Sequence, residues 1–238
     1  MIGARRGYGG PGGIDPLLLI GLLLLAYGFF TGSLFAPVRD PVFFVAFVIA
    51  IVLGITVHEF MHAYVAHRLG DDTARLLGRL SLNPMAHLDP FGTLLLVLAG
   101  FGYGKPVPFN ESRLRSSLGV TAVALAGPLA NFALAALFAI PLRFGSADVL
   151  GDVYVTILRY IVQMNCILAI FNLIPIPPLD GSNVVYGLLP PRQQYSWRTF
   201  QQYGPFLLLF LLLLAPRVFS SVVFAPALAL TTFLTGLR

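Results

Sequence analysis

Long apolar stretches dominate the sequence and decide which environment the chain can fold in. One of them runs from Pro41 to Leu69 and contains only two charged residues, Glu59 and Arg68. At about 1.5 Å per residue, a helix over this stretch is long enough to cross ~30 Å of hydrocarbon. Over the whole chain 57% of the residues are hydrophobic and 11% are charged, whereas soluble domains carry about 25% charged residues. The chain is therefore predicted to be an integral membrane protein.

The positions of the polar breaks predict an all-α polytopic fold with about five to six transmembrane helices. We expect a flexible cytoplasmic tail over residues 1–15 and transmembrane helix 1 over residues 16–35. Residues 41–189 are expected to form the membrane core, with helices over 42–69, 118–142 and 154–173. Residues 190–238 are expected to form one or two C-terminal apolar helices.

The segment 93–109 differs from the other apolar stretches. Its apolar part is about ten residues long, which is too short to span a bilayer, and five Gly and Pro residues interrupt it. We therefore expect a short re-entrant or β-like element here, buried against the helices. An exposed strand edge in this segment could receive a substrate by strand addition, and a loop that only plugs the membrane face is the alternative.

The distribution of Lys and Arg predicts the orientation. If the N-terminus is cytoplasmic, the two outside loops contain only Arg39 and Arg143, and the cytoplasmic segments contain most of the remaining basic residues. The net charge of +5 then reflects cytoplasmic loops in contact with the lipid bilayer, and no nucleic-acid partner is expected. This orientation places residues 58–62 and Asp180 toward the cytoplasmic side.

Three polar residues at the end of the 41–69 stretch form an HExxH motif: His58, Glu59 and His62. Ionisable groups within a span are costly and usually functional. At i and i+4 on a helix, the two imidazoles lie on one face and can bind one Zn²⁺, and the adjacent Glu59 can act as a general base on a water. Catalytic zinc takes three protein ligands, so one ligand must come from elsewhere in the chain.

Several residues could supply this third ligand: His67, Asp71, Asp72, His87, Asp89 and Asp180. His67 follows His62 by five residues, a helical rotation of about 500°, so it points away from the pair. Asp71 and Asp72 follow Gly70 at an expected helix end and are expected to be solvated. Asp180 differs because it lies in an apolar stretch broken by prolines, at the expected depth of the HExxH face.

HEFMH in one span and FNLIPIPPLDG at the end of a later one resemble the site-2 protease family of M50-type intramembrane zinc metalloproteases. The resemblance covers residues 41–189 and is closest to compact bacterial members without a PDZ-like or nucleotide-binding regulatory domain. It implies that His58, His62 and Asp180 bind one zinc ion and that Glu59 is the general base. It also implies that Asn172 faces the active site, where its amide could stabilise an oxyanion or serve only in helix packing.

The function expected from this resemblance is hydrolysis of peptide bonds in or near transmembrane segments of membrane proteins. Zinc would activate the water and Glu59 would accept its proton, in a prokaryotic cell membrane with the active site open to the cytoplasm. A non-catalytic membrane zinc-binding or zinc-transport protein is the alternative, although such a site gains little from Glu59. A prenyl-protein type of protease would need a third ligand from a later Glu, and Glu111 lies in a polar loop.

Overall fold

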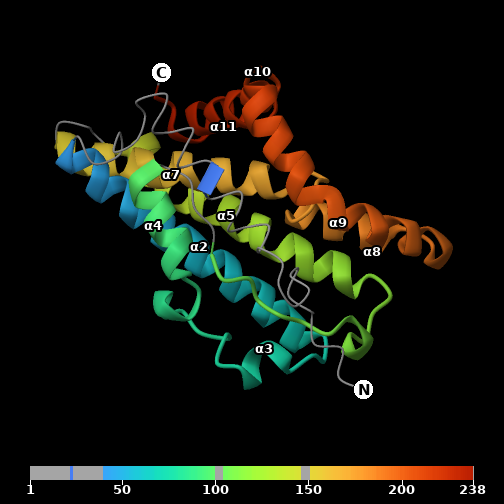
Figure 1. Ribbon diagram of the computed structural model, residues 1–238. Coiled ribbons are helices and arrows are strands. Elements are labelled where there is room, and N and C mark those ends of the chain that lie inside the picture. Colours follow the sequence, from blue (N-terminus) through green and yellow to red (C-terminus); the bar gives the residue numbers. More distant parts are fainter. Residues whose placement is uncertain (1–21, 24–39, 100–103, 146–150, 238) are drawn as a thin grey trace.

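The structure is a computed structural model that describes residues 22–23, 40–99, 104–145 and 151–237. Within these residues the chain is helical, without strands, which confirms the predicted all-α class (Figure 1). The elements are α2 (Pro41–Arg68), α3 (Thr73–Leu76), η2 (Pro84–Ala86), α4 (Pro90–Ala99), η3 (Glu111–Arg113), α5 (Gly119–Phe144), α7 (Asp152–Asn172), α8 (Asp180–Leu188), α9 (Pro191–Leu214), α10 (Pro216–Phe219), η4 (Ser220–Phe224) and α11 (Ala225–Thr235).

Four helical segments in the described part are long and apolar enough to cross a membrane. They are α2, α5, α7 and the continuous run of α10, η4 and α11 over Pro216–Thr235. The first three begin and end within two residues of the predicted spans. The expected span over residues 16–35 lies outside the described residues, apart from Leu22 and Leu23, which are helical.

Local chemistry at both ends of α2 explains its boundaries. Asp40 caps the helix, because its Oδ1 accepts hydrogen bonds from the N–H groups of Val42 and Phe43 at 2.8 and 3.1 Å. Pro41 occupies the first helical position, where its missing N–H costs nothing. Gly70 follows the other end with φ +105°, a conformation that a residue with a side chain rarely adopts.

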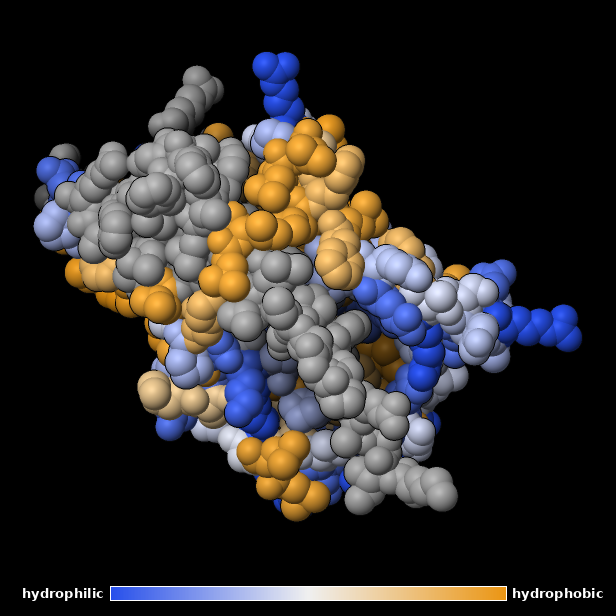
Figure 2. Space-filling model, in the orientation of Figure 1, coloured by the Kyte–Doolittle hydropathy of each residue, from blue (hydrophilic) through white to orange (hydrophobic). Residues whose placement is uncertain are grey.

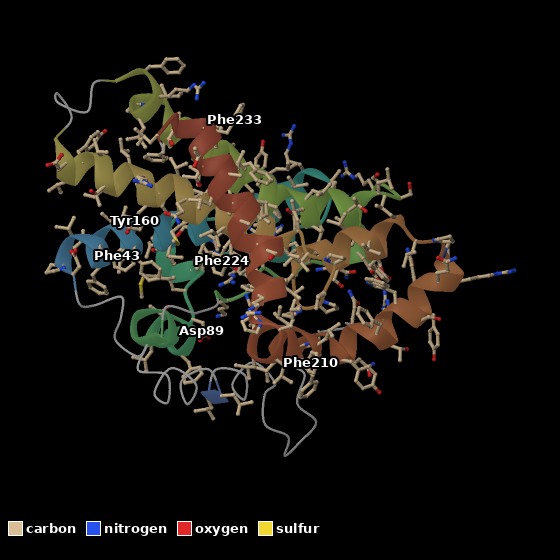
Figure 3. The ribbon with its side chains drawn as sticks, turned by 90° about the horizontal axis from the view of Figure 1, so that it is seen from above. Phe43, Asp89, Tyr160, Phe210, Phe224 and Phe233 are labelled. Carbon is tan, nitrogen blue, oxygen red and sulfur yellow. The ribbon has the colours of Figure 1, made fainter. Side chains whose placement is uncertain are left out.

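The core of the bundle is formed by α2, α5 and α7, which pack against one another, and α11 covers α5 and α7. Figure 3 shows Phe43 of α2 and Tyr160 of α7 pointing toward each other, with ring centroids 4.9 Å apart in an edge-on arrangement. Many of the buried residues between these helices are alanines, which let the backbones approach closely. Figure 2 shows hydrophobic residues over the upper middle of this face and hydrophilic residues along much of the right edge, near the start of α9, with a further hydrophobic group at the lower edge near α3.

The segment between α2 and α5 is only partly as predicted. Thr93–Ala99 belongs to helix α4, so extended backbone was the wrong expectation there. Among the described residues of this segment, the one feature of β type is an antiparallel bridge between Leu88 and Gly104. Asp89, which is labelled in Figure 3, caps α4: its Oδ1 accepts a hydrogen bond of 2.8 Å from the N–H of Gly92. Whether this element enters the bilayer and returns stays a prediction.

A buried arginine holds this segment together. Arg79 is 5% exposed, and its guanidinium donates hydrogen bonds to the carbonyls of Ala86, Lys105 and Pro106. Burial lowers the pKa of Arg79, and the nearby Glu59 carboxylate raises it in part. Because three backbone oxygens depend on one side chain, Arg79 fixes the path of residues 105–106 beside α2.

Asp71 corrects one of the sequence interpretations. It was expected to be solvated, but it is fully buried and accepts hydrogen bonds from the Thr73 hydroxyl and from Asn110 N–H, both at 2.5 Å. Asn110 follows Asp71 by 39 residues. The sequence reveals no such long-range partner, so a residue next to a helix end is assigned to solvent by default.

We expect Arg79→Leu to loosen the 84–106 segment and to lower the free energy of unfolding by about 3 kcal/mol, because three carbonyls lose a charged donor. Thermal unfolding in detergent and amide hydrogen exchange of this segment measure the effect. Arg75→Leu is the matched control, since Arg75 is exposed and pairs with Asp72 at the surface, where such a pair contributes little. Equal loss in both variants would contradict the assignment.

Candidate metal centre

Three ligand-type side chains converge where α2, α5 and α8 meet. His58 and His62 lie one turn apart on α2 and are 6% and 7% exposed. Asp180 begins α8, and its Oδ2 lies 2.9 Å from His58 Nε2 and 3.2 Å from His62 Nε2. The two Nε2 atoms are 3.0 Å apart. These three are the residues that the sequence and the resemblance brought together.

The remaining ring nitrogens of the two histidines are bound to oxygen acceptors. His58 Nδ1 lies 2.6 Å from Asn131 Oδ1, and His62 Nδ1 lies 2.6 Å from the Val123 carbonyl, both on α5. An acceptor at Nδ1 requires the hydrogen to be on that nitrogen, so each Nε2 presents a lone pair to the common point. This arrangement, in which each imidazole donates its other N–H to an oxygen, is typical of metal-binding histidines.

Gly127 leaves space beside the two imidazoles. A Cβ at this position would lie 2.4 Å from His62 Nε2 and 2.6 Å from His58 Nε2, which is impossible without displacement. The spacing of the ligand atoms also suits zinc, because tetrahedral ligands about 2.0 Å from the metal are roughly 3.3 Å apart. Two neutral imidazoles and one carboxylate form a donor set that fits Zn²⁺ and leaves a fourth position for water.

Glu59 lies next to His58 on α2, and its carboxylate is held by another segment. Its Oε2 accepts a hydrogen bond of 2.9 Å from the N–H of Val107. The backbone at Val107 follows the stretch that Arg79 fixes, so the position of Glu59 depends indirectly on this arginine.

The hydrogen bonds of residues 105–108 argue against strand addition on this stretch. The N–H of Lys105 donates to the His87 carbonyl at 2.7 Å, and the N–H of Val107 donates to Glu59. Pro106 and Pro108 have no N–H. A substrate strand would find no free N–H donor along these four residues, and strand addition elsewhere in the 93–109 segment stays a prediction.

Asp180 is placed by contacts on both sides of it. A Cβ at Gly181 would lie 2.2 Å from the Leu173 carbonyl, so only glycine allows α8 to fold back so tightly on the end of α7. From α9, Trp197 Nε1 donates to the Ser182 carbonyl at 3.0 Å, and Gln201 Nε2 donates to Ser182 Oγ at 3.1 Å. These α9 contacts were missed from the sequence, where residues 190–238 were expected only to form one or two apolar helices.

A further polar contact joins α9 to the loop before α5. Arg198 donates to Glu111 and to the Tyr186 hydroxyl, which lies 2.9 Å from its Nε. The hydrogen bond to Tyr186 and the Glu111 carboxylate raise the pKa of Arg198. Glu111, the residue that a prenyl-protein type of site would require as ligand, is therefore engaged at the surface.

The other candidates lie apart from the three converging side chains. His67 pairs with Asp72 at 2.6 Å on the partly exposed end of α2. It therefore points away from His58 and His62, as its rotation about the helix axis predicted. His87 is fully buried, with Nε2 2.6 Å from the Ser81 carbonyl. Asn172 donates to the Leu168 carbonyl one turn earlier on α7, at 3.0 Å, so its role toward a substrate stays a prediction.

Comparison with known proteins now identifies the family. The model of peptidase family M50 matches residues 46–147 and 141–215. YwhC of Bacillus subtilis is 40% identical over 172 residues, which cover 68% of this chain and 78% of YwhC. The chain belongs to peptidase family M50. This M50 peptidase is also 28% identical over 213 residues to Rip2 of Mycolicibacterium smegmatis, with 86% of this chain and 82% of Rip2 covered.

The relatives agree in chemistry. The names of YwhC and Rip2 describe zinc metalloproteases, and so does the name of MJ0392 of Methanocaldococcus jannaschii. MJ0392 is 25% identical to this chain over 157 residues, which cover 66% of this chain and 38% of MJ0392. No solved structure matches the chain significantly. The family confirms the resemblance to site-2 proteases, and this M50 peptidase is a zinc metalloprotease with apolar helices that suit an integral membrane protein.

We expect Gly127→Ala to abolish zinc binding by this M50 peptidase while the fold is retained, because the added methyl group fills the space beside both Nε2 atoms. In a helix, Gly→Ala is otherwise favourable by about 1 kcal/mol. Zinc content per purified chain measures the effect, and Leu129→Ala, on the exposed face of α5, is the control. Full zinc content in Gly127→Ala would show that the space is not needed.

Proposed function

We propose that this M50 peptidase hydrolyses peptide bonds in or near the transmembrane segments of membrane-protein substrates. The observation that carries the proposal is the position of the metal centre within the helix bundle. His58 and His62 are buried in α2, a helix suited to span a bilayer, and not in a soluble domain. A scissile bond must therefore reach the site at membrane depth.

His58, His62 and Asp180 are proposed as the zinc ligands. When bound, zinc supplies Lewis acidity that lowers the pKa of a coordinated water to near 7. The protein's contribution is to fix the ligands: Asn131 and Val123 orient the imidazoles, and α9 holds the start of α8. Burial excludes bulk water, which strengthens the electrostatic effect of each of these groups.

Glu59 is proposed as the general base. Its Oε2 is anchored by Val107 N–H, so the side chain is held in place before a substrate arrives. Glu59 would accept a proton from the attacking water and later return it to the amine leaving group. Asn172 is the proposed donor to the developing oxyanion, which requires its amide to leave the Leu168 carbonyl.

We further propose that the site opens toward the cytoplasm. The last third of α2 and the start of α8 lie toward the same end of the bundle as α3, the short helix that contains Arg75 (Figure 1). Basic residues favour the cytoplasmic side, where water also reaches the site most easily. Cleavage would then release a cytoplasmic fragment of the substrate.

Replacement of Glu59 by Gln is expected to reduce proteolysis of a transmembrane model substrate by at least about 100-fold while zinc content is unchanged, because only the proton acceptor is lost. Cleavage in detergent or liposomes, with zinc content measured on the same preparation, tests this. If wild type binds zinc but cleaves no more than Glu59→Gln, the non-catalytic zinc-binding alternative is favoured.

Asp180→Asn is expected to lower zinc content well below one per chain, since an anionic ligand becomes a neutral amide. His67→Ala is the control, because His67 is partly exposed and pairs with Asp72, which is not one of the proposed ligands. Stoichiometric zinc in purified Asp180→Asn, or an equal loss in His67→Ala, would refute the ligand assignment.

A further inference from the structure

A chain of buried amides leads from His58 across the bundle to α7. His58 Nδ1 lies 2.6 Å from Asn131 Oδ1, and Asn131 Nδ2 donates to Asn165 Oδ1 at 2.8 Å. Asn165 Nδ2 in turn donates to the Ile161 carbonyl at 2.8 Å. Both asparagines are 0% exposed, so each amide group must find its partners inside the protein.

We propose that Asn165 is a positioning residue for the zinc site. Within the described residues, its side chain hydrogen-bonds to Asn131 and to the Ile161 carbonyl, and it acts through Asn131 on His58. The inference rests on the proposed role of His58 as a zinc ligand. In this proposal α7 has two functions: it leads the chain to Asp180, and through Asn165 it helps to position His58.

The argument turns on the orientation of the Asn131 amide. Its Nδ2 donates to the Gly54 carbonyl at 3.1 Å as well as to Asn165 Oδ1. If the amide were turned over, its oxygen would face two acceptors and its NH₂ group would face His58 Nδ1. Two acceptors therefore fix Asn131 with its oxygen toward His58, and Asn165 supplies one of them.

The orientation of Asn131 decides which nitrogen of His58 can bind the metal. An oxygen at Nδ1 holds the hydrogen on Nδ1 and leaves the lone pair on Nε2, which faces Asp180. An NH₂ group at Nδ1 would favour the opposite tautomer, with a hydrogen on Nε2. The Ile161 carbonyl in turn orients the Asn165 amide. Each group in the chain therefore donates its hydrogen to the next one, from His58 through Asn131 and Asn165 to Ile161.

Close packing of α2 against α7 keeps these groups within range. A Cβ at Gly54 would lie 2.7 Å from Leu168 Cδ1 and 3.1 Å from Asn165 Oδ1. Glycine at this position lets α7 approach the Gly54 carbonyl that Asn131 also uses. The competing explanation is that Asn165 only joins α5 to α7, in which case its loss would affect stability and leave the affinity for zinc unchanged.

The test measures the zinc affinity of the full-length chain in detergent, by competition with a chelator. Asn165→Leu is expected to weaken zinc binding by about 10-fold, the lower end of the range found when a partner of a metal-binding histidine is removed. Asn165→Asp is expected to retain the wild-type affinity. As a buried neutral acid it accepts from Asn131 and donates to Ile161 as the amide does.

Asn131→Leu and the double variant Asn131→Leu/Asn165→Leu separate the proposal from simple packing. If Asn165 acts through Asn131, the double variant binds zinc as weakly as Asn131→Leu and no weaker. Gln163→Leu, two residues away on α7, is the matched control and is expected to bind zinc normally. If Asn165→Leu does not fold, Asn165→Ser replaces it, because the shorter side chain cannot reach Asn131.

Three results would overturn the proposal. They are wild-type zinc affinity in Asn165→Leu or Asn165→Ser, effects of Asn131 and Asn165 that add in the double variant, and a loss in Gln163→Leu equal to that in Asn165→Leu. Failure of the proposed zinc site itself is distinguishable, because His58→Ala would then bind zinc as the wild type does, whatever the Asn165 variants show.

Discussion

Two imidazoles buried in an apolar helix bundle need partners for four ring nitrogens, and much of the structure depends on that requirement. α5 supplies oxygens to both Nδ1 atoms, through Asn131 and the Val123 carbonyl. Asp180 from α8 lies against both Nε2 atoms. An unpaired polar group would be costly at this depth, so two helices, α5 and α8, are tied to α2 by the same two side chains.

Small residues make this convergence possible. Gly127 leaves room beside the Nε2 atoms, Gly54 allows α7 to approach α2, and Gly181 lets α8 turn back on α7. Helix association in lipid relies on close packing because the hydrophobic effect does not drive helices together there. The same close approaches bring buried polar groups within hydrogen-bonding distance, so packing and chemistry depend on the same positions.

Much of this could be predicted. The α2, α5 and α7 boundaries follow from apolar length and from Asp, Pro and Gly at the helix ends, and the HExxH spacing places His58 and His62 on one face. The β-like expectation was wrong for residues 93–99, because the Gly and Pro residues of the 93–109 segment begin only at Gly100 and the part before it, which belongs to α4, favours a helix. Asp71 was assigned to solvent because its partner Asn110 lies far away in the sequence.

The sequence by itself determined the environment, the helical class and the identity of the metal-binding motif, because apolar length and i, i+4 spacing are local properties. Only the tertiary structure decided how the two histidines are oriented, where Glu59 is anchored and what holds Asp180 in place. Those features arise from contacts between residues 15 to 73 positions apart: Asn131 with His58, Val107 with Glu59 and Trp197 with Ser182. No local pattern encodes such contacts, since they exist only once the helices have packed.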